Sequence, residues 1–275
     1  FQYDGGGTLI TDSGIPTLLM EDEATNEYLN SDVLATQSNS TTANVYTISF
    51  YGTGTVTLSG AYVGSLVGTG VGDRVSLTFT STLATLTSTI TGSVTKGQLE
   101  VGTFATSYIP TTTAIRTRLG ESCNDGGSVD SINSAEGILY ANIAPLGVDS
   151  SKRAISLNGG NDSDRLIIRY TSNNQIQVIF RAGSFNVVNQ VIALSNPLDF
   201  NQIAVSYKLN EFIIVVNGVQ IGSTITSGAV FGTTVNSIDF EEYNGLDKFR
   251  GKVLKLEYYD NAAETIAQLQ TLTTR

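Results

Sequence analysis

IAVSYKLNEFIIVVNGVQIG, residues 203–222, decides the fold of this chain. Apolar and small residues alternate from Ile203 to Tyr207, which is the period of a strand with one buried face. After a short polar turn, residues 212–216 are apolar at every position, which predicts a strand buried on both faces and central in its sheet. Asn217-Gly218 then favours positive φ at both central turn positions. The stretch predicts a β-meander in the middle of a sandwich.

Short strands separated by glycines fill most of the remaining chain. Between residues 43 and 95 the alternation is nearly unbroken, and Thr and Ser at its outer positions predict a neutral, hydroxyl-rich surface. In the second half, strands are predicted at 137–143, 153–157, 165–170, 175–181, 187–194, 236–243 and 249–259. A helix is predicted over 261–273, with Ala267, Leu269 and Leu272 packed beneath the sandwich.

The polar, glycine-ended stretch 113–127 lacks periodicity and predicts a linker. The fold class is therefore all-β, with two tandem antiparallel β-sandwich (jelly-roll) domains and one short C-terminal helix. The domains are predicted at 1–112 and 128–275, on either side of the linker. Because the only Met is Met20, we expect the chain to be part of a longer polypeptide.

Composition excludes several classes of function. With His 0 and Cys 1, neither a Ser-His-Asp triad nor a His- or thiolate-ligated metal centre can form, and no cofactor or metal is predicted. A net charge of −10 disfavours nucleic acid and anionic membranes as partners. No apolar run approaches the ~18 residues that a membrane-spanning helix needs, so no membrane insertion is expected. Carboxylates, Lys and Tyr are the chemistry that remains.

Three groups of polar residues in the first half of the chain are predicted to have structural roles. Glu21–Glu23 is predicted to be a solvated turn after a buried strand. Gln98 and Glu100 share a strand face and are predicted to bond the backbone or a neighbouring strand. Arg116 and Arg118 of the linker are predicted to make interdomain contacts.

Three stretches resemble proteins of tailed phages. The meander resembles the central hairpin of laminin-G/concanavalin A-like domains in virion proteins. IPTLLMEDEATNEYLNSD, residues 15–32, resembles an opening motif of phage tail proteins, with Thr25-Asn26 at its Thr-Asn pair. KGQLEVGTFATSYIPTTT, residues 96–113, is similar to the closing strand of a carbohydrate-binding-module-like domain in phage structural and tail-fibre proteins.

This resemblance implies a carbohydrate-binding-module-like domain followed by a laminin-G/concanavalin A-like domain. It implies a non-enzymatic virion structural protein, either a tail-fibre or receptor-binding component or a head-decoration component, exposed on the surface of the particle. The implied partners are a glycan of the host cell surface, other virion proteins and further copies of the chain in a homotrimer.

The alternative is a carbohydrate-active enzyme, a glycoside hydrolase or its accessory binding module. Asp239 and Glu241 would share one face of a strand over 238–243, as the catalytic carboxylates of concanavalin-like glucanases do. That pattern needs a further Glu just upstream, where this chain has Ser237 and Ile238. A third possibility is an architectural spacer without a ligand.

Candidate ligand-binding residues lie in two loops and on two tyrosines. The turn 158–164, NGGNDSD, is rich in oxygen ligands and is either a Ca²⁺-binding rim loop or a plain Asx-rich turn. The loop 241–247 and the rings of Tyr170 and Tyr243 could form a shallow sugar-binding surface, with a buried or half-buried sheet aromatic as the alternative for each ring. The candidates are Asn158, Asn161, Asp162, Asp164, Tyr170, Tyr243, Asn244 and Asp247.

Overall fold

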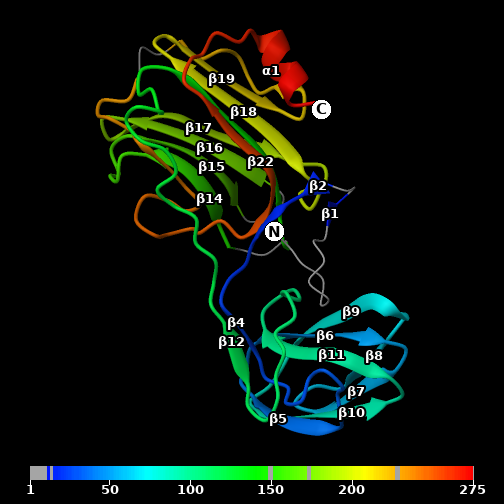
Figure 1. The fold of residues 1–275 in the computed structure, drawn as a ribbon. Helices are drawn as coiled ribbons and strands as arrows, with labels where there is room; N and C mark the ends of the chain where they lie inside the picture. Colours follow the sequence, from blue (N-terminus) through cyan, green and yellow to red (C-terminus); the bar gives the residue numbers. More distant parts are fainter. Residues whose placement is uncertain (1–10, 13–14, 148–150, 172–174, 227–229, 275) are drawn as a thin grey trace. The chain divides into compact units, whose positions relative to one another are not determined.

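The computed structural model describes residues 11–12, 15–147, 151–171, 175–226 and 230–274. The described residues form two compact units. The small unit is Glu21–Glu121, and the large unit combines strand β3 (Leu18–Met20) with the chain from Ser122 onward (Figure 1). Each unit contains antiparallel sheets packed around its own core, so the predicted all-β class with two sandwiches is confirmed.

Two sheets build the large unit. The six-stranded sheet runs in the order β20 (Val219–Gln220), β19 (Glu211–Val216), β18 (Asn201–Lys208), β13 (Gly137–Pro145), β22 (Gly251–Tyr259) and β3. The five-stranded sheet runs β17 (Phe185–Ala193), β16 (Gln175–Ala182), β15 (Arg165–Thr171), β14 (Arg153–Asn158) and β21 (Ser237–Asp239). Side chains such as Leu139, Phe180 and Tyr207 fill the core between the sheets. The short strands β1 (Thr11–Asp12) and β2 (Ile15–Pro16) pair with each other.

The predicted meander is present as β18, β19 and β20. Its second turn has positive φ at both central residues, 49° at Asn217 and 78° at Gly218. Phe212 and Ile214 of β19 face the core, whereas Ile213 and Val215 face outward and are equally buried. Contrary to the prediction, β19 lies second from the sheet edge. It is apolar on both faces because helix α1 (Ile266–Leu272) covers its outer face (Figure 1).

Helix α1 is shorter than predicted and begins at a capping box. The Thr265 side chain accepts a hydrogen bond from the Gln268 backbone, and the Gln268 side chain accepts one from the Thr265 backbone. Leu269 is fully buried against the outer face of the six-stranded sheet, and Leu272 is partly buried there. Ala267 is exposed, so the prediction that it packs on the sandwich is wrong. No helix in the described ranges is long and apolar enough to span a membrane.

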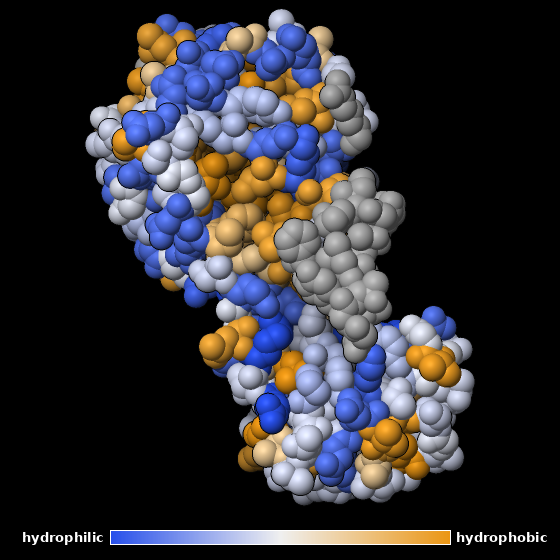
Figure 2. Space-filling view, viewed as in Figure 1, coloured by the Kyte–Doolittle hydropathy of each residue, from blue (hydrophilic) through white to orange (hydrophobic). Residues whose placement is uncertain are grey.

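The small unit packs a four-stranded and a three-stranded sheet around residues such as Tyr28, Phe50 and Leu99. The first sheet is β5 (Gln37–Thr41), β10 (Ala84–Thr91), β7 (Thr55–Gly60) and β8 (Gly64–Val67); the second is β11 (Val94–Val101), β6 (Val45–Gly52) and β9 (Gly70–Thr80). A further pair joins β12 (Arg116–Arg118) to β4 (Ala24–Asn26). In Figure 2 the surface of this unit is mostly pale, as expected for abundant Thr and Ser.

The boundaries between the units differ from the predicted division at 112 and 127. Strand β3 pairs with β22, Leu18 opposite Val253, so the small unit is inserted in the chain between two parts of the large one. Part of the predicted linker is strand β12, which belongs to the small unit. The first ten residues of the predicted first domain lie outside the described residues.

Glu21 corrects one further prediction. It is 4% exposed, so it is no solvated turn residue, although Asp22 and Glu23 are exposed. Its carboxylate lies 3.1 Å from Arg118 Nη2, and Arg118 Nη1 lies 2.7 Å from Glu121. Arg118 therefore pairs with two carboxylates inside the small unit.

Buried polar side chains hold the closing segment of the small unit. Gln98 Nε2 donates to Glu100 Oε1 at 2.7 Å, and the backbone N–H of Ile109 donates to Gln98 Oε1 at 2.7 Å. Glu100 also accepts from the backbone and hydroxyl of Thr106, at 3.0 and 2.6 Å. Both side chains are fully buried, and the predicted structural role of this pair is confirmed.

Candidate functional site

A polar depression of about 430 Å³ lies on the outer face of the five-stranded sheet of the large unit. Strand β14 reaches it at Asn158, strand β21 at Ser237 and Asp239, and the loop after β21 at Glu241 and Tyr243. Its full lining is Asn124, Asp125, Asn158, Gly159, Gly160, Asn236, Ser237, Asp239, Glu241 and Tyr243. Two predicted ligand-binding residues, Asn158 and Tyr243, are thus brought together here.

The base of the depression is a closed hydrogen-bond network. Asn158 lies opposite Ser237 in the β14–β21 ladder, and its amide donates to Asp239 Oδ2 at 2.7 Å. Asp239 Oδ1 accepts from the Ser237 hydroxyl at 2.6 Å and from the backbone N–H of Asp125 at 2.7 Å. Asn158 and Asp239 are 1% and 8% exposed. The polar groups of these side chains are satisfied by hydrogen bonds within the protein, and the network makes the floor rigid.

The rim carries polar groups that are free to meet a ligand. Within the described part of the chain, the carboxylates of Asp125 and Glu241, the side-chain amide of Asn236 and the hydroxyl of Tyr243 make no hydrogen bond or ion pair. The lining contains three carboxylates and no Lys or Arg. Such a surface offers many acceptors and suits ligands with several O–H or N–H donors.

Two arginines of β15 fix the loop that carries Tyr243. Arg169 Nη1 lies 2.5 Å from Glu242 Oε1 and 3.1 Å from Asp247 Oδ2, and Glu242 is 8% exposed. The Arg165 guanidinium lies 4.8 Å from the Tyr243 ring centroid, in a cation–π contact. Two backbone contacts complete the hold: Ser156 Oγ donates to Glu241 O at 2.6 Å, and Ala154 N to Asp247 O at 2.7 Å.

The carboxylates of the turn 158–164 point to different partners. Asp164 is fully buried and accepts from the backbone N–H of Gly183 and Gly232 and from the Thr233 hydroxyl. Asp162 lies 2.6 Å from Arg165 and 2.5 Å from Arg181.

The remaining turn residue, Asn161, accepts from the backbone N–H of Ser163 and Asp164, as in an Asx turn. Among the described residues, no three His, Cys, Asp or Glu side chains are arranged to hold a metal ion. The geometry favours the plain turn over the Ca²⁺ loop.

Two other predicted residues do not face a ligand surface. Tyr170 is 2% exposed in the core, where its hydroxyl donates to Ile143 O at 2.9 Å. Asn244 is exposed, and its Oδ1 accepts from the backbone N–H of Leu246 at 3.3 Å within a turn. Tyr243 and Asp247 are therefore the aromatic and acidic residues of this loop that the arginines position.

The carboxylate pattern of the glucanases is not formed. Strand β21 ends at Asp239, Phe240 turns into the core, and Glu241 lies in the following loop. Glu241 therefore does not lie on the strand as predicted, although it lines the same depression as Asp239. The hydrogen bonds that Asp239 accepts are those of a structural anchor.

Sequence reasoning missed Asn124, Asp125, Asn236 and the arginines. Asn124 and Asp125 lay in the predicted linker, and the bridge between Gly126 and Ile238 and hydrogen bonds to Asp239 and Phe240 bring them to β21. Nothing local in the sequence marks this pairing. Arg165 and Arg181 are sixteen positions apart in the sequence and meet Asp162 only through the β15–β16 register.

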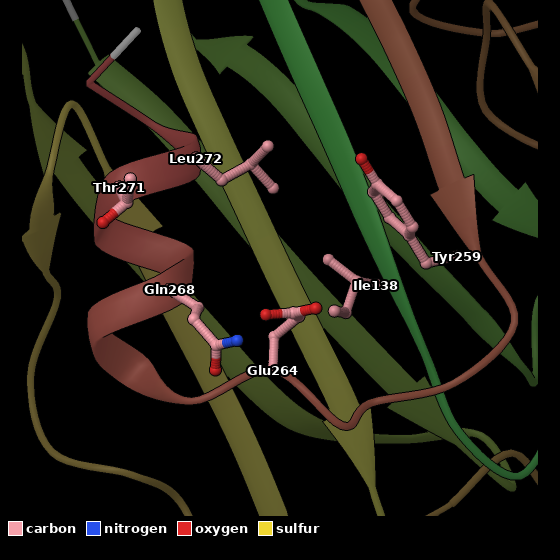
Figure 3. Close-up of a pocket in the computed structure, with 6 residues that line it drawn as sticks. All are labelled: Ile138, Tyr259, Glu264, Gln268, Thr271 and Leu272. Carbon is pink, nitrogen blue, oxygen red and sulfur yellow. The ribbon is translucent and has the colours of Figure 1, made fainter.

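A second concave site, which we call the helix groove, lies on the outer face of the six-stranded sheet. It measures about 290 Å³ and is lined by Ile138, Tyr259, Glu264, Gln268, Thr271 and Leu272 (Figure 3). Strands β13 and β22 supply one side, and helix α1 with the residues before it supplies the other (Figure 3). The two sites thus lie on opposite faces of one sandwich.

Comparison with known proteins identifies no family. No protein-family model matches the chain, and no curated protein matches it. Among solved structures, the Ruminococcus gnavus IT-sialidase CBM40 is similar over 51% of this chain and 84% of its own, at 15% identity and a TM-score of 0.43. A leech intramolecular trans-sialidase covers 52% of this chain and 24% of its own, at 18% identity and a TM-score of 0.43.

The native heptameric SAP-like pentraxin of Limulus polyphemus is similar over 55% of this chain and 74% of its own, at 11% identity and a TM-score of 0.41. At these values the likenesses bear on no residue of the site. The hydrogen bonds, burial and charges of the large unit itself are what define its chemistry.

Proposed function

We propose that this chain is a non-enzymatic glycan-binding protein that holds carbohydrate at the polar depression of its large unit. The observation that carries the proposal is the contrast between floor and rim. The floor at Asn158 and Asp239 is closed by its own hydrogen bonds, whereas the rim presents unpartnered carboxylate, amide and phenol groups. A preorganised floor with free polar groups above it lowers the ordering cost of binding.

The rim chemistry matches sugar hydroxyls. A carboxylate such as that of Glu241 can accept two hydroxyl donors, and the Asn236 amide can both donate and accept. The Tyr243 ring adds an apolar surface beside these groups, and Arg165 holds it in place. Such a shallow site works by several weak contacts, without any step that breaks a bond.

The negative charge of the polar depression determines which glycans it favours. Three carboxylates line the depression without a cation, and the chain has a net charge of −10. A carboxylated or sulfated sugar would meet like charge at the rim. The preferred ligand is therefore a neutral polysaccharide.

The proposed setting is the virion of a tailed phage, where the chain would serve in a tail fibre, receptor-binding structure or head decoration. The stretches 15–32, 96–113 and 203–222 support this through their resemblance to phage proteins. In a homotrimer, three shallow sites would add their weak affinities through a high effective concentration. Sedimentation over a range of protein concentrations tests the trimer, and a monomer at every concentration would refute it.

Binding to a panel of neutral and acidic bacterial surface polysaccharides, with reducing ends assayed in the same wells, tests the function. Tyr243→Ala and Glu241→Gln should each weaken binding, whereas Asn244→Ala in the same loop should not. New reducing ends that disappear in Asp239→Asn would replace this proposal with the glycoside hydrolase. Absence of binding across the panel would favour a spacer.

A further inference from the structure

The helix groove combines an apolar floor with polar walls. Ile138 of β13 lies at its base and is fully buried by its surroundings, and Leu272 of α1 is partly buried beside it. The Tyr259 ring stands across the groove from the helix, and the Glu264 carboxylate lies between them (Figure 3). Polar and apolar groups thus line the same groove, which is the arrangement of a small-molecule site.

The polar groups of the groove have defined vacant positions. Gln268 uses its Oε1 to accept from Thr265 in the capping box, so its nitrogen points away from the cap and toward the groove (Figure 3). Within the described residues, neither that nitrogen nor the Glu264 carboxylate has a hydrogen-bond partner. The hydroxyls of Thr271 and Tyr259 donate to Ala267 O and Glu257 Oε2, which leaves their lone pairs as acceptors.

We propose that the helix groove binds the acetamido group of a neutral N-acetylhexosamine, as a second carbohydrate site on this sandwich. An acetamido group has one N–H donor, one carbonyl acceptor and one methyl group. Glu264 accepts from the N–H, the Gln268 amide donates to the carbonyl, and the methyl group packs against the partly buried Leu272. The sugar ring then packs against Tyr259, which is 38% exposed and offers an accessible ring face.

The size and charge of the helix groove limit which ligands it can bind. A volume of about 290 Å³ is at the lower limit of ligand pockets and holds one sugar residue. Glu264 disfavours sugars that carry a carboxylate, including N-acetylated acidic sugars. A peptide side chain ending in an acetamide shares the donor, acceptor and methyl group, but it presents no ring of hydroxyls to Thr271 and Tyr259.

The inference relies on the proposed function only for the class of ligand, because the groove and the polar depression lie on opposite faces of the large unit. The variant Gln268→Glu provides a sharp test. Glutamate at this position preserves the capping box, since its carboxylate still accepts from the Thr265 backbone. It removes the amide donor and opposes the sugar carbonyl with a negative charge.

The experiment is titration of the whole chain with methyl glycosides of N-acetylglucosamine and glucose, followed by NMR at the Gln268 side-chain amide. N-acetylglucosamine should shift this resonance, and glucose should bind at least about tenfold more weakly. Gln268→Glu should weaken N-acetylglucosamine binding at least about tenfold with an unchanged unfolding temperature. Tyr243→Ala should leave this binding intact, which separates it from the polar depression.

Four results would overturn the inference. Equal affinity for the two methyl glycosides would show that the groove does not recognise the acetamido group. Unchanged affinity in Gln268→Glu would remove the proposed donor, and a lack of shift at the Gln268 amide would place any binding elsewhere. Tighter binding of N-acetyl-lysine methylamide would assign the groove to a modified peptide.

Discussion

The guanidinium of Arg165 lies 4.8 Å from the ring centroid of Tyr243 and 2.6 Å from the Asp162 carboxylate. One side chain thereby joins the loop that carries Tyr243 to the turn that follows β14. The contact positions an aromatic ring at the rim of the polar depression without using any group that a sugar would need.

Replacing Arg165 by Met should weaken glycan binding about fivefold, because the Tyr243 ring loses its cation–π partner. The fold should persist, since Glu242 keeps Arg169 and Asp162 keeps Arg181. Isothermal titration with a glycan found in the panel measures the effect. Arg181→Met is the matched control, because Arg181 shares Asp162 but does not contact Tyr243; an equal loss there would contradict the role assigned to Arg165.

Glu242→Gln should lower the free energy of unfolding by about 1–3 kcal/mol. The Glu242 carboxylate is 8% exposed and faces Arg169 at 2.5 Å, so a neutral partner leaves the arginine charge less compensated in a buried place. Urea denaturation measures the change. Glu211→Gln removes the more exposed Lys208 pair and should cost less than about 0.5 kcal/mol; similar losses in both variants would argue against burial as the cause.

Glu21 should make the small unit less stable as the pH rises. Burial raises the pKa of this carboxyl above its usual 4.5, against the opposing effects of Arg118 and Ser107. The folded state then holds the proton more tightly than the unfolded state, so the contribution of Glu21 to stability falls as the pH rises above about 4.5. The free energy of unfolding relative to Glu21→Gln should therefore decline over this range.

Denaturation of both proteins between pH 4 and 7 checks this trend. Glu23→Gln, at an exposed position of the same acidic run, controls for the loss of one surface charge. If the free energy of unfolding of the wild type, relative to that of Glu21→Gln, rose with pH, the sign would be opposite and the argument would be refuted.

Asn26→Ala should destabilise the small unit by about 2–4 kcal/mol, because it leaves several buried backbone groups unpaired. The Asn26 amide donates to the carbonyl oxygens of Gly97 and Ile109, and its Oδ1 accepts from the backbone N–H of Tyr28 and Leu99. Hydrogen exchange of the Tyr28 and Leu99 amides should accelerate at least about tenfold. Thr25→Ala, which loses only an exposed hydroxyl contact, should leave both rates nearly unchanged.

Local pattern predicted the strands and the meander well, because alternation and the Asn217-Gly218 turn act within a few residues. It failed where the outcome depends on distant partners. The three residues of β3 have no local feature that assigns them to β22 across the inserted unit. Residues 212–216 predict a central strand because both of their faces are apolar. This pattern does not show whether a sheet or a helix covers the second face.

The candidate site was predicted in part for the same reason. Asn158 and Tyr243 were found because turn and loop residues with polar side chains stand out in sequence. Tyr170 was a candidate for the sugar-binding surface with a buried sheet aromatic as its alternative, and the core side of β15 shows that the alternative holds. Strand β21 ends at Asp239 and Glu241 lies in the following loop, although both carboxylates line the polar depression; where a strand ends depends on its pairing partners, which spacing does not reveal.

The pairing of β3 with β22 also has a mechanical consequence. Tension applied to the chain before β3 and after β22 meets the ladder between these strands first, where Leu18, Leu19 and Met20 lie opposite Val253, Lys252 and Gly251. While those three residue pairs hold, the small unit is bypassed and carries no load. Once they part, the force passes to the ends of the small unit, where the backbone N–H of Glu121 donates to Glu21 O at 3.0 Å. The β3–β22 pairing thus shields the small unit from the force, and the small unit can extend only after that pairing has broken.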